Sequence, residues 1–430
     1  MPNLFSPFTL KGVTLRNRIG MSPMTMYRST DGKMDDFHVM YLGARAAGGF
    51  GLVFPEQIAI TPDGRTTTHC AGLYDDDQIE GHKRVTDMIK AMGGVPAIQL
   101  GHTGRKGSLV TPWEGGHMLP PEHEAGWQTR APSAIAYGGT LPYTPRELTV
   151  DEIAQLMKDY AATTERALAA GYEWVEMHFA HGYLGSEFFS PLANQRTDQY
   201  GGSLENRSRF HLEALDAVRA VLPDRIPLTM RLGIDDLHPG GIEVDESITA
   251  IGWMKEHGLD LADLSIGFNT DDMRGDVPIG KLGGMLGHAK RVRDEVDIPV
   301  ATSWNLGVPE LANQVIADEG IDLIYLGRSA LANPHWPVYA ARQLGFDDPF
   351  SLVPEDWAWW LRNLRGAPEA IGWPLPPESA AAGLAGAAGV SASAPIVDEL
   401  AASGPAPTSP PVGEAVPDTA GGGSAELVDA

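Results

Sequence analysis

Two histidines and a tyrosine, His178, His181 and Tyr183, lie within six residues of one another in the segment HFAHGY. An imidazole N–H can donate a hydrogen bond to an oxygen that gains negative charge in a reaction, and a phenol can deliver a proton. A His-x-x-His pair can also supply half of a metal site, which needs further ligands from Cys, His, Asp or Glu. The residue types alone leave both interpretations open, metal ligation and hydrogen bonding to an anionic ligand.

The place of these three residues in the chain indicates an active site. They follow an apolar run, Trp174 to Met177, that is typical of a buried strand, and Gly182 and Gly185 end that strand. Eight strand-like runs of this kind occur, at 19–21, 51–57, 95–100, 174–179, 228–233, 261–266, 299–303 and 323–327.

Segments with helical periodicity separate these runs, at 36–47, 78–92, 150–170, 204–222, 246–257, 282–296, 309–319 and 334–344. The clearest follows Thr149, which forms a Ser/Thr-x-x-Glu capping box with Glu152. Strands that alternate with helices form a parallel sheet with right-handed crossovers, and eight such units close into a barrel. We therefore predict an α/β fold, a (β/α)8 TIM barrel, over residues 1–366.

In such a barrel the chemistry lies on loops at the carboxyl ends of the strands. The polar residues expected there, together with their neighbours, are Ser22, Pro23, Met24, Thr25, Met26, Tyr27, Gln57, Gln99, His102, His178, His181, Tyr183, Arg231, Ser303, Trp304, Asn305, Gly327 and Arg328. Carboxylates are scarce in this set, which weakens the metal interpretation. The sequence Gly327-Arg328-Ser329, just before a helical segment, fits the phosphate site that barrels build after strands seven and eight. Arg231 is placed to neutralise a reduced, negatively charged ring, and Gln99 to bond a pyrimidine edge.

Composition excludes several classes of protein. The chain has 430 residues, a net charge of −24 and a pI near 4.8, which argue against a nucleic-acid partner. One cysteine, Cys70, allows neither an intrachain disulfide nor a cysteine metal cluster. The first 20 residues have no basic region followed by an apolar run, so we expect no signal peptide, and the sequence shows no apolar span of about 20 residues. We expect a cytoplasmic protein with no membrane association.

Several segments resemble the old yellow enzymes, flavin-dependent ene-reductases, and most closely the bacterial branch that contains the xenobiotic reductases. They are LFSPFTLKGVTLRNRI, SPMTMYRS, IQLGHTGRKGS, the block from His178 to Phe210, and YLGRSALANPHWP. The resemblance covers roughly residues 1–365. It implies a barrel that binds FMN noncovalently, accepts hydride from NADPH or NADH, and passes it to an α,β-unsaturated carbonyl compound.

The resemblance also implies a role for each residue of the set. His178 and His181 hydrogen-bond the carbonyl oxygen of the substrate, and Tyr183 gives a proton to its α carbon. The FMN-binding residues are Ser22, Pro23, Met24, Thr25, Gln57, Gln99, Arg231, Ser303, Trp304, Asn305, Gly327 and Arg328. Tyr27, Trp304 and Trp360 shape the substrate pocket. The site is expected to bind no metal ion. Thr25 and Gln57 depart from the pattern, because related bacterial enzymes usually have Cys and Ala there.

Three segments fall outside the barrel plan. The loop from His102 to Leu148 is long enough to act as a lid or to hold small elements of its own. In related bacterial enzymes the segment at the place of the tryptophan-rich sequence EDWAWWLRNLR packs at a dimer interface, and one of its residues, by position Trp360, reaches the active site of the neighbouring subunit. The alternative is that these tryptophans cover the barrel's own surface. A homodimer or homotetramer is expected. Residues 367–430 are rich in Ala, Pro, Gly and Ser, and we predict a disordered tail.

Two alternatives to an ene-reductase stay open. One is a related flavin barrel that reduces nitro compounds, acts on aromatic thioesters or carries out oxidative demethylation. The other is a metal-dependent hydrolase on the same fold, without flavin.

Overall fold

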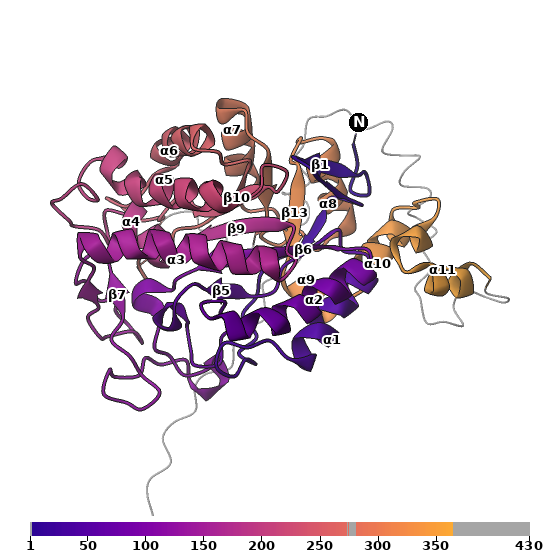
Figure 1. Cartoon of the computed structure of the whole chain (residues 1–430). Helices are drawn as coiled ribbons and strands as arrows, with labels where there is room; N and C mark the ends of the chain where they lie inside the picture. The colour runs from indigo at the N-terminus through magenta and orange to yellow at the C-terminus, as the bar shows by residue number, and fades with distance from the viewer. Residues whose placement is uncertain (1, 273, 275–280, 364–430) are drawn as a thin grey trace, which may run out of the picture. The chain divides into compact units, whose positions relative to one another are not determined.

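In the computed structural model, which describes residues 2–272, 274 and 281–363, parallel strands close into a barrel (Figure 1). Its eight strands are β3 Ile19–Met21, β4 Leu52–Val53, β6 Val95–Gly101, β9 Trp174–Phe179, β10 Leu228–Gly233, β11 Leu261–Ser265, β12 Val300–Thr302 and β13 Leu323–Leu326. The hydrogen-bonded order is β4-β3-β13-β12-β11-β10-β9-β6, and a β4–β6 pairing closes the ring. The predicted (β/α)8 TIM barrel is confirmed.

Helices surround the barrel, and Figure 1 shows α3 and α5 side by side on its outer surface. The helices that follow the strands are α1 Asp36–Ala47, α2 Ile79–Ala91, α3 Val150–Ala169, α5 Leu204–Val221, α6 Val244–Glu256, α7 Leu286–Val296, α8 Pro309–Ala317 and α10 Trp336–Gln343. Three shorter helices were not predicted, namely α4 Leu184–Phe189, α9 Arg328–Ala332 and α11 Glu355–Arg362. Two of them, α4 and α9, follow β9 and β13, and their N-cap residues, Tyr183 and Gly327, belong to the predicted site.

The start of α3 shows how the sequence determines a helix boundary. Thr149 Oγ1 accepts a hydrogen bond from the Glu152 amide at 3.2 Å, and the Thr149 amide donates to Glu152 Oε2 at 2.9 Å. Ile153, Leu156 and Tyr160 are buried on the face toward the barrel. The capping box and the helical periodicity therefore agree, and the predicted helix forms where expected.

The second predicted strand differs from the expectation. Instead of one strand over residues 51–57, the chain forms β4 at Leu52–Val53 and a separate β5 at Gln57–Ala59, which pairs with β6. Pro55 lies between them, and a proline has no amide hydrogen to give to a sheet. The break turns the chain so that Gln57 is opposite Gln99.

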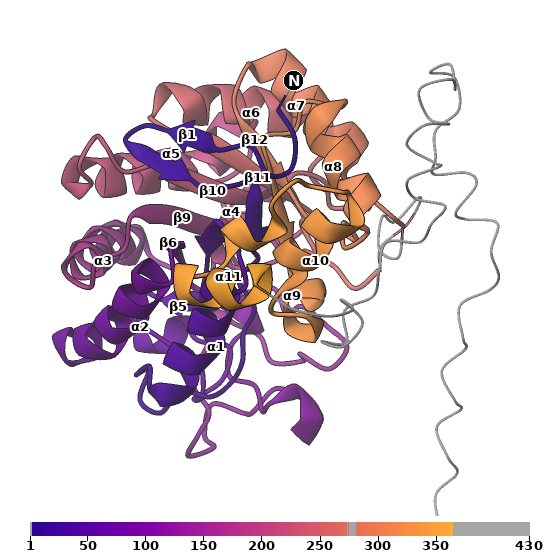
Figure 2. The ribbon, with the colours of Figure 1, turned by 90° about the vertical axis from the view of Figure 1, so that its right-hand side faces the viewer.

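An antiparallel hairpin covers the amino-terminal end of the barrel. Its strands are β1 Phe8–Leu10 and β2 Val13–Leu15, and Figure 2 looks onto this end. Side chains of the hairpin and of the barrel interior near this end form one buried cluster: Phe8, Val13, Leu15, Leu52, Phe54, Ala97, Trp174, Leu261, Ala301, Leu323 and Tyr325. Apolar side chains therefore fill the barrel at the amino-terminal ends of its strands, and the polar interior positions lie at the carboxyl-terminal ends.

The loop after β6 contains small elements, as predicted. They are two short 3-10 turns, Gly104–Lys106 and Pro112–Glu114, and the parallel pair β7 Arg130–Ala131 and β8 Arg146–Glu147. The predicted tail, 367–430, lies outside the described residues. Within the described residues, no helix combines the length and apolar character that a membrane span would need.

Candidate active site

The three residues of the HFAHGY segment meet at the carboxyl end of β9. His178 is the fifth residue of that strand, His181 lies in the turn after it, and Tyr183 is the N-cap of α4. The His178 ring lies edge-on to both partners, with centroids 5.0 Å from the His181 ring and 5.0 Å from the Tyr183 ring. Two imidazoles and a phenol therefore surround one small region.

Residues with a strained backbone occur in several of the loops around this region. Five non-glycine residues have positive φ there: Tyr27 at 54°, His181 at 63°, Phe268 at 53°, Trp304 at 76° and Asn305 at 59°. Bulky residues rarely adopt this conformation, and proteins keep such strain mainly at functional sites. Strands β3, β9, β11 and β12 each contribute one of these loops.

Both imidazoles are neutral at ordinary pH. Burial holds the pKa of His178 and of His181 well below the usual value, and the charge of Arg231 lowers both further. Burial also raises the pKa of the Tyr183 phenol, although a hydrogen bond with Thr66 opposes the rise. The cluster therefore offers neutral hydrogen-bond donors and a protonated phenol.

Arg231 connects strands across the mouth of the barrel. Its register partners are His178 on β9 and Asp263 on β11, so all three side chains point inward. Its Nη1 and Nη2 groups donate to the hydroxyls of Ser22 and Ser303, each at 2.9 Å, beyond β3 and β12. The buried guanidinium of Arg231 thus links the loop after β3 to the loop after β12, and both loops carry predicted flavin-binding residues.

Two buried carboxyl groups lie beside Arg231 and Gln99. Asp263 Oδ2 is 3.3 Å from Arg231 Nε, and Glu176 Oε1 accepts a hydrogen bond from Gln99 Nε2 at 2.8 Å. Burial raises the pKa of both carboxyl groups, and the charge of Asp263 raises that of Glu176 further. Gln99 therefore has its amide N–H turned toward Glu176, a contact that the sequence did not indicate.

The loops after β12 and β13 approach each other through glycines. A Cβ at Gly307 would lie 2.2 Å from Ser329 Oγ, and one at Gly327 would lie 3.3 Å from Met24 Sδ. Arg328 is exposed at the first position of α9, and it has no ion pair or hydrogen bond with the described residues. The first amides of a helix have no acceptor within the helix. These donors and the close backbone approach fit the phosphate of FMN, as Arg231 fits its ring.

Other predicted residues lie around the same region, with different partners. Thr25 is half-buried, and its hydroxyl makes no hydrogen bond to any described residue. Gln57 is buried and donates to the Gly64 carbonyl at 3.4 Å. Asn305 is exposed and donates from Nδ2 to the Lys281 carbonyl at 2.9 Å, so its amide is engaged by the β11–α7 loop. The aromatic ring of Tyr27 lies edge-on to that of Trp113, 5.6 Å away.

Trp360 lies outside this region. It is on α11, its side chain is 73% exposed, and its ring contacts Trp359 at 4.9 Å. A hollow of about 530 Å³ is lined by Trp360, Trp357, His335 and three neighbours, all from the segment 333–361. Within one chain, the structure therefore does not bring Trp360 to the histidines.

Two residues that hold His181 were not among those expected from the sequence. Ser265, the last residue of β11, has its Oγ 2.7 Å from His181 Nε2. Lys106 Nζ donates to the carbonyls of His181 and Phe268, at 2.8 and 2.7 Å. The rule that selects residues at strand ends applies to Ser265 as well, because it is the last residue but one of the sixth predicted strand, 261–266, and the last residue of β11. Lys106 lies in the long loop, where no periodicity gives its position.

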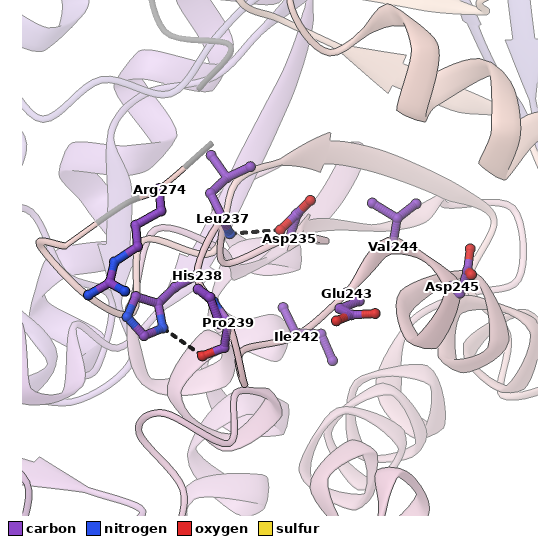
Figure 3. A pocket seen from close by; sticks show the side chains of 9 residues that line it. All are labelled: Asp235, Leu237, His238, Pro239, Ile242, Glu243, Val244, Asp245 and Arg274. Carbon is purple, nitrogen blue, oxygen red and sulfur yellow. Dashed lines mark hydrogen bonds between the residues drawn. The ribbon is translucent and has the colours of Figure 1, made fainter. Parts of the chain in front are cut away.

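A separate hollow of about 510 Å³ lies beside the β10–α6 loop (Figure 3). Its lining includes Asp235, His238, Glu243 and Arg274, and two of its polar groups are bonded within the loop. Asp235 accepts from the Leu237 amide at 2.7 Å, and His238 Nδ1 is 2.8 Å from the Pro239 carbonyl. The residues of the predicted set do not line this hollow.

The metal interpretation of the histidine pair needs a further ligand nearby. Among the residues the structure describes, no three side chains from His, Cys, Asp and Glu are grouped as a metal site. His181 Nε2 is already bonded to Ser265. The geometry therefore favours hydrogen bonding to a ligand oxygen.

A barrel with a buried arginine, a glycine-rich pair of loops and neutral imidazoles at its mouth is typical of a flavin-dependent oxidoreductase. The chain belongs to the NADH:flavin oxidoreductase / NADH oxidase family, whose model matches residues 3–346. The resemblance to the old yellow enzymes is thereby confirmed, and the protein is an FMN-dependent oxidoreductase with a reduced nicotinamide as reductant.

Solved structures show the same relationship. Morphinone reductase in complex with tetrahydroNAD is 28% identical, with a TM-score of 0.65, and the match covers 88% of this chain and 99% of that one. 2-Naphthoyl-CoA reductase is also 28% identical, with a TM-score of 0.71 over 82% of this chain, but this chain spans only about half of it, 53%. The old yellow enzyme homologue from Zymomonas mobilis, 24% identical with a TM-score of 0.64 over 88% of this chain and 98% of that one, shares the fold.

Proposed function

We propose that this protein reduces the activated C=C bond of α,β-unsaturated carbonyl compounds with NADPH or NADH. The observation that supports this most is the meeting of two neutral imidazoles and a protonated phenol beside Arg231. Bound FMN supplies the hydride that reaches the β carbon of the substrate. The carbonyl oxygen then gains negative charge, and a saturated product forms only if the α carbon also receives a proton.

His178 and His181 stabilise that charge as hydrogen-bond donors to the substrate oxygen. Because the oxygen is more negative in the transition state than in the bound substrate, such donors lower the barrier selectively. Removing one donor of this kind costs about 2–4 kcal/mol of transition-state stabilisation. Tyr183 gives its phenolic proton to the α carbon and regains one from solvent. Tyr27 and Trp304 form walls of the substrate site.

The remaining residues of the set hold FMN. Arg231, which donates to Ser22 and Ser303, would neutralise the charge that the flavin ring gains on reduction, and Gln99 and Thr25 would hydrogen-bond that ring. Gly327 and Arg328 bind the phosphate. Pro23, Met24, Gln57 and Asn305 complete the surroundings of the cofactor by their position in the barrel mouth.

Separate measurement of the two half-reactions tests the proposal. The holoenzyme is reduced anaerobically with NADPH or NADH, freed of excess nicotinamide, and mixed with cyclohexenone, a maleimide, a nitroaromatic or a quinone. We expect rapid reoxidation by the enone and the maleimide, with the saturated product in stoichiometric yield. His178→Ala should slow enone reduction by about 30- to 1,000-fold, the ratio that corresponds to one lost donor. Reoxidation by quinones alone would contradict the proposal.

Aromatic thioester reduction is the second candidate, and the similarity to 2-naphthoyl-CoA reductase favours it. A thioester carbonyl would use the same two imidazoles, so the residues at the barrel mouth do not separate the candidates. An aryl-CoA substrate added to the anaerobically reduced enzyme does. Reoxidation with formation of a dihydroaromatic thioester would identify this activity, and no reoxidation would eliminate it.

We also propose that the protein forms a homodimer through α11 and α1. Trp357, Trp359 and Trp360 on α11 and Met40 on α1 are exposed large apolar side chains, and Trp357 and Met40 line one hollow. Apolar groups of this size are typical of interface anchors. Trp360→Ala should weaken association in sedimentation velocity, whereas Trp113→Ala, at a tryptophan that is 69% exposed on the β6–α3 loop, should not. A monomeric wild-type protein would disprove the dimer.

A further inference from the structure

Ser265 lies between two residues of the candidate site and contacts both. Its hydroxyl oxygen is 2.7 Å from His181 Nε2 and 3.3 Å from Trp304 Nε1. The side chain is fully buried at the end of β11. No other side-chain hydrogen bond of Ser265 occurs among the residues the structure describes. The orientation of this hydroxyl therefore depends on its two neighbours.

The indole determines the direction of these hydrogen bonds. An indole N–H can only donate, so Ser265 Oγ is the acceptor in its contact with Trp304. The serine hydroxyl still has one hydrogen, and a buried hydroxyl hydrogen without an acceptor is costly. His181 Nε2 is the acceptor within reach. The serine therefore donates to Nε2, and Nε2 carries no hydrogen.

This direction determines which nitrogen of His181 can act as a donor. Burial and the charge of Arg231 lower the pKa of His181, so its imidazole is neutral and carries one hydrogen. If Nε2 accepts from Ser265, that hydrogen is on Nδ1. The two nitrogens of an imidazole point in nearly opposite directions, so the Nδ1–H group points away from Ser265.

The rest of the surroundings hold the imidazole in place. The His181 amide donates to the Ile266 carbonyl at 3.1 Å, and Lys106 donates to the His181 carbonyl at 2.8 Å. Phe268 lies between the two rings, with centroids 5.9 Å from His181 and 6.0 Å from Trp304. The backbone amide and carbonyl of His181 and its Nε2 are therefore bonded, and Nδ1 has no hydrogen-bond partner among the residues that the structure describes.

We propose that Ser265 is a positioning residue that fixes His181 as the Nδ1–H tautomer through a Trp304-to-Ser265-to-His181 chain of hydrogen bonds. The proposal rests on the proposed function, because it makes His181 a donor that suits a carbonyl, enolate or phenolate oxygen. A ligand that offers only a hydroxyl hydrogen at this place gains no bond from Nδ1. Ser265 thus contributes to the choice of substrate without touching it.

The tautomer can be measured in the resting holoenzyme without turnover. In protein labelled with ¹⁵N in its histidines, a nitrogen that carries hydrogen differs in chemical shift from one that accepts a hydrogen bond. The His181 resonances are assigned by their loss in His181→Asn. We expect an Nδ1–H, Nε2-acceptor pattern for His181 in the wild-type protein. A pattern with hydrogen on Nε2 would overturn the proposal.

Ser265→Ala and Ser265→Thr form a matched pair of variants. Ser265→Ala removes the hydroxyl, so the His181 signals should shift toward Nε2–H, and 4-chlorophenolate, titrated by its charge-transfer band with oxidised flavin, should bind roughly 5- to 10-fold more weakly. Ser265→Thr keeps the hydroxyl and should restore both the tautomer and the binding. An Ala variant that keeps the wild-type tautomer and affinity would also overturn the proposal.

The two proposals fail separately. If the wild-type enzyme reduces no enone but shows the Nδ1–H tautomer, the proposed reaction is wrong and the role of Ser265 stands. If it reduces enones and carries hydrogen on Nε2, the reaction stands and the role of Ser265 is wrong. If Ser265→Ala loses FMN, the ¹⁵N spectrum of the wild-type protein and the measurements on Ser265→Thr decide the question.

Discussion

Tyr183 serves only one half of the proposed reaction. Reduction by a nicotinamide needs no acid at this place, whereas saturation of a C=C bond needs a proton at the α carbon. Tyr183→Phe should therefore leave the reductive half-reaction unchanged and slow reoxidation by enones about 10²- to 10⁴-fold. Stopped-flow traces of flavin absorbance measure both rates. Quinones, which need no proton from this residue, provide the control acceptor, and equal losses in both half-reactions would assign Tyr183 a positional role instead.

Thr25 is one of the two residues, with Gln57, that we expect to differ from related bacterial enzymes. Its hydroxyl has no hydrogen-bond partner among the described residues, so it is free to donate to a bound flavin. Such a bond to a charged edge contributes about 1.5–3 kcal/mol, or about 30–60 mV for a two-electron couple. We expect Thr25→Ala to lower the midpoint potential by this amount in an anaerobic dye titration. Thr25→Ser keeps the hydroxyl and should stay near the wild-type value; an unchanged or raised potential in Thr25→Ala contradicts the bond.

The residues at the strand ends could be selected from the sequence because a parallel barrel has one reactive end. This rule brought together His178, His181, Tyr183 and Arg231, which do lie together. It could not show that Gln99 bonds Glu176 or that Ser265 bonds His181, because such partners depend on side-chain rotamers and strand register. Partners across strands carry no local sequence signal.

At the scale of elements, long segments with regular periodicity were predictable, and short ones were not. The α3 helix has both a capping box and an apolar face, so its start was predicted at the correct residue. The β1–β2 hairpin was missed although apolar residues alternate on either side of Lys11-Gly12, a turn in which Lys11 has φ of 50°. Strands of three residues fall below the length at which an apolar pattern is distinctive.

The capping box of α3 provides a test at this scale. Thr149→Ala removes the oxygen that accepts from the Glu152 amide, and loss of an N-cap costs about 1 kcal/mol. The urea midpoint of the holoenzyme should fall accordingly, with enone turnover unchanged in the absence of urea. Thr149→Ser keeps the acceptor and should recover most of the loss. A midpoint in Thr149→Ala equal to that of the wild type would show that the Arg146–Glu152 ion pair holds this helix end alone.

At the scale of the whole molecule, buried histidines make stability depend on pH. His211 is fully buried among Phe179, Phe189 and Phe210, and its ring nitrogens have no hydrogen-bond partner among the described residues. Burial lowers its pKa to about 3. The unfolded chain takes up a proton near pH 6.5, and the folded chain does not. Stability is therefore complete above that pH and falls as the pH decreases toward the folded pKa.

His211→Leu removes this term. Below pH 6.5 the lowered pKa of His211 costs the wild-type protein about 1.4 kcal/mol of stability for each pH unit. Going from pH 7.5 to pH 5 should therefore lower the free energy of unfolding of the wild type by about 2 kcal/mol more than that of His211→Leu. Urea denaturation at both pH values measures the difference. Other groups titrate equally in both proteins, so they cancel in this comparison. If the difference in free energy of unfolding between His211→Leu and the wild type does not change with pH, His211 is protonated in the folded protein as it is in the unfolded chain.

The two-residue strand β4 has a consequence for how the barrel opens. It shares two register pairs with β3 and two with β6, one of which involves Pro96, whereas β9 and β10 share five. Native-state amide hydrogen exchange should therefore be faster at Leu52 and Val53 than at residues 175–179. The ring should separate along β4 before it separates between β9 and β10, and the β4 pairings adjoin the loops that carry Thr25 and Gln57. Binding of flavin across these loops should slow exchange at β4 more than at β9.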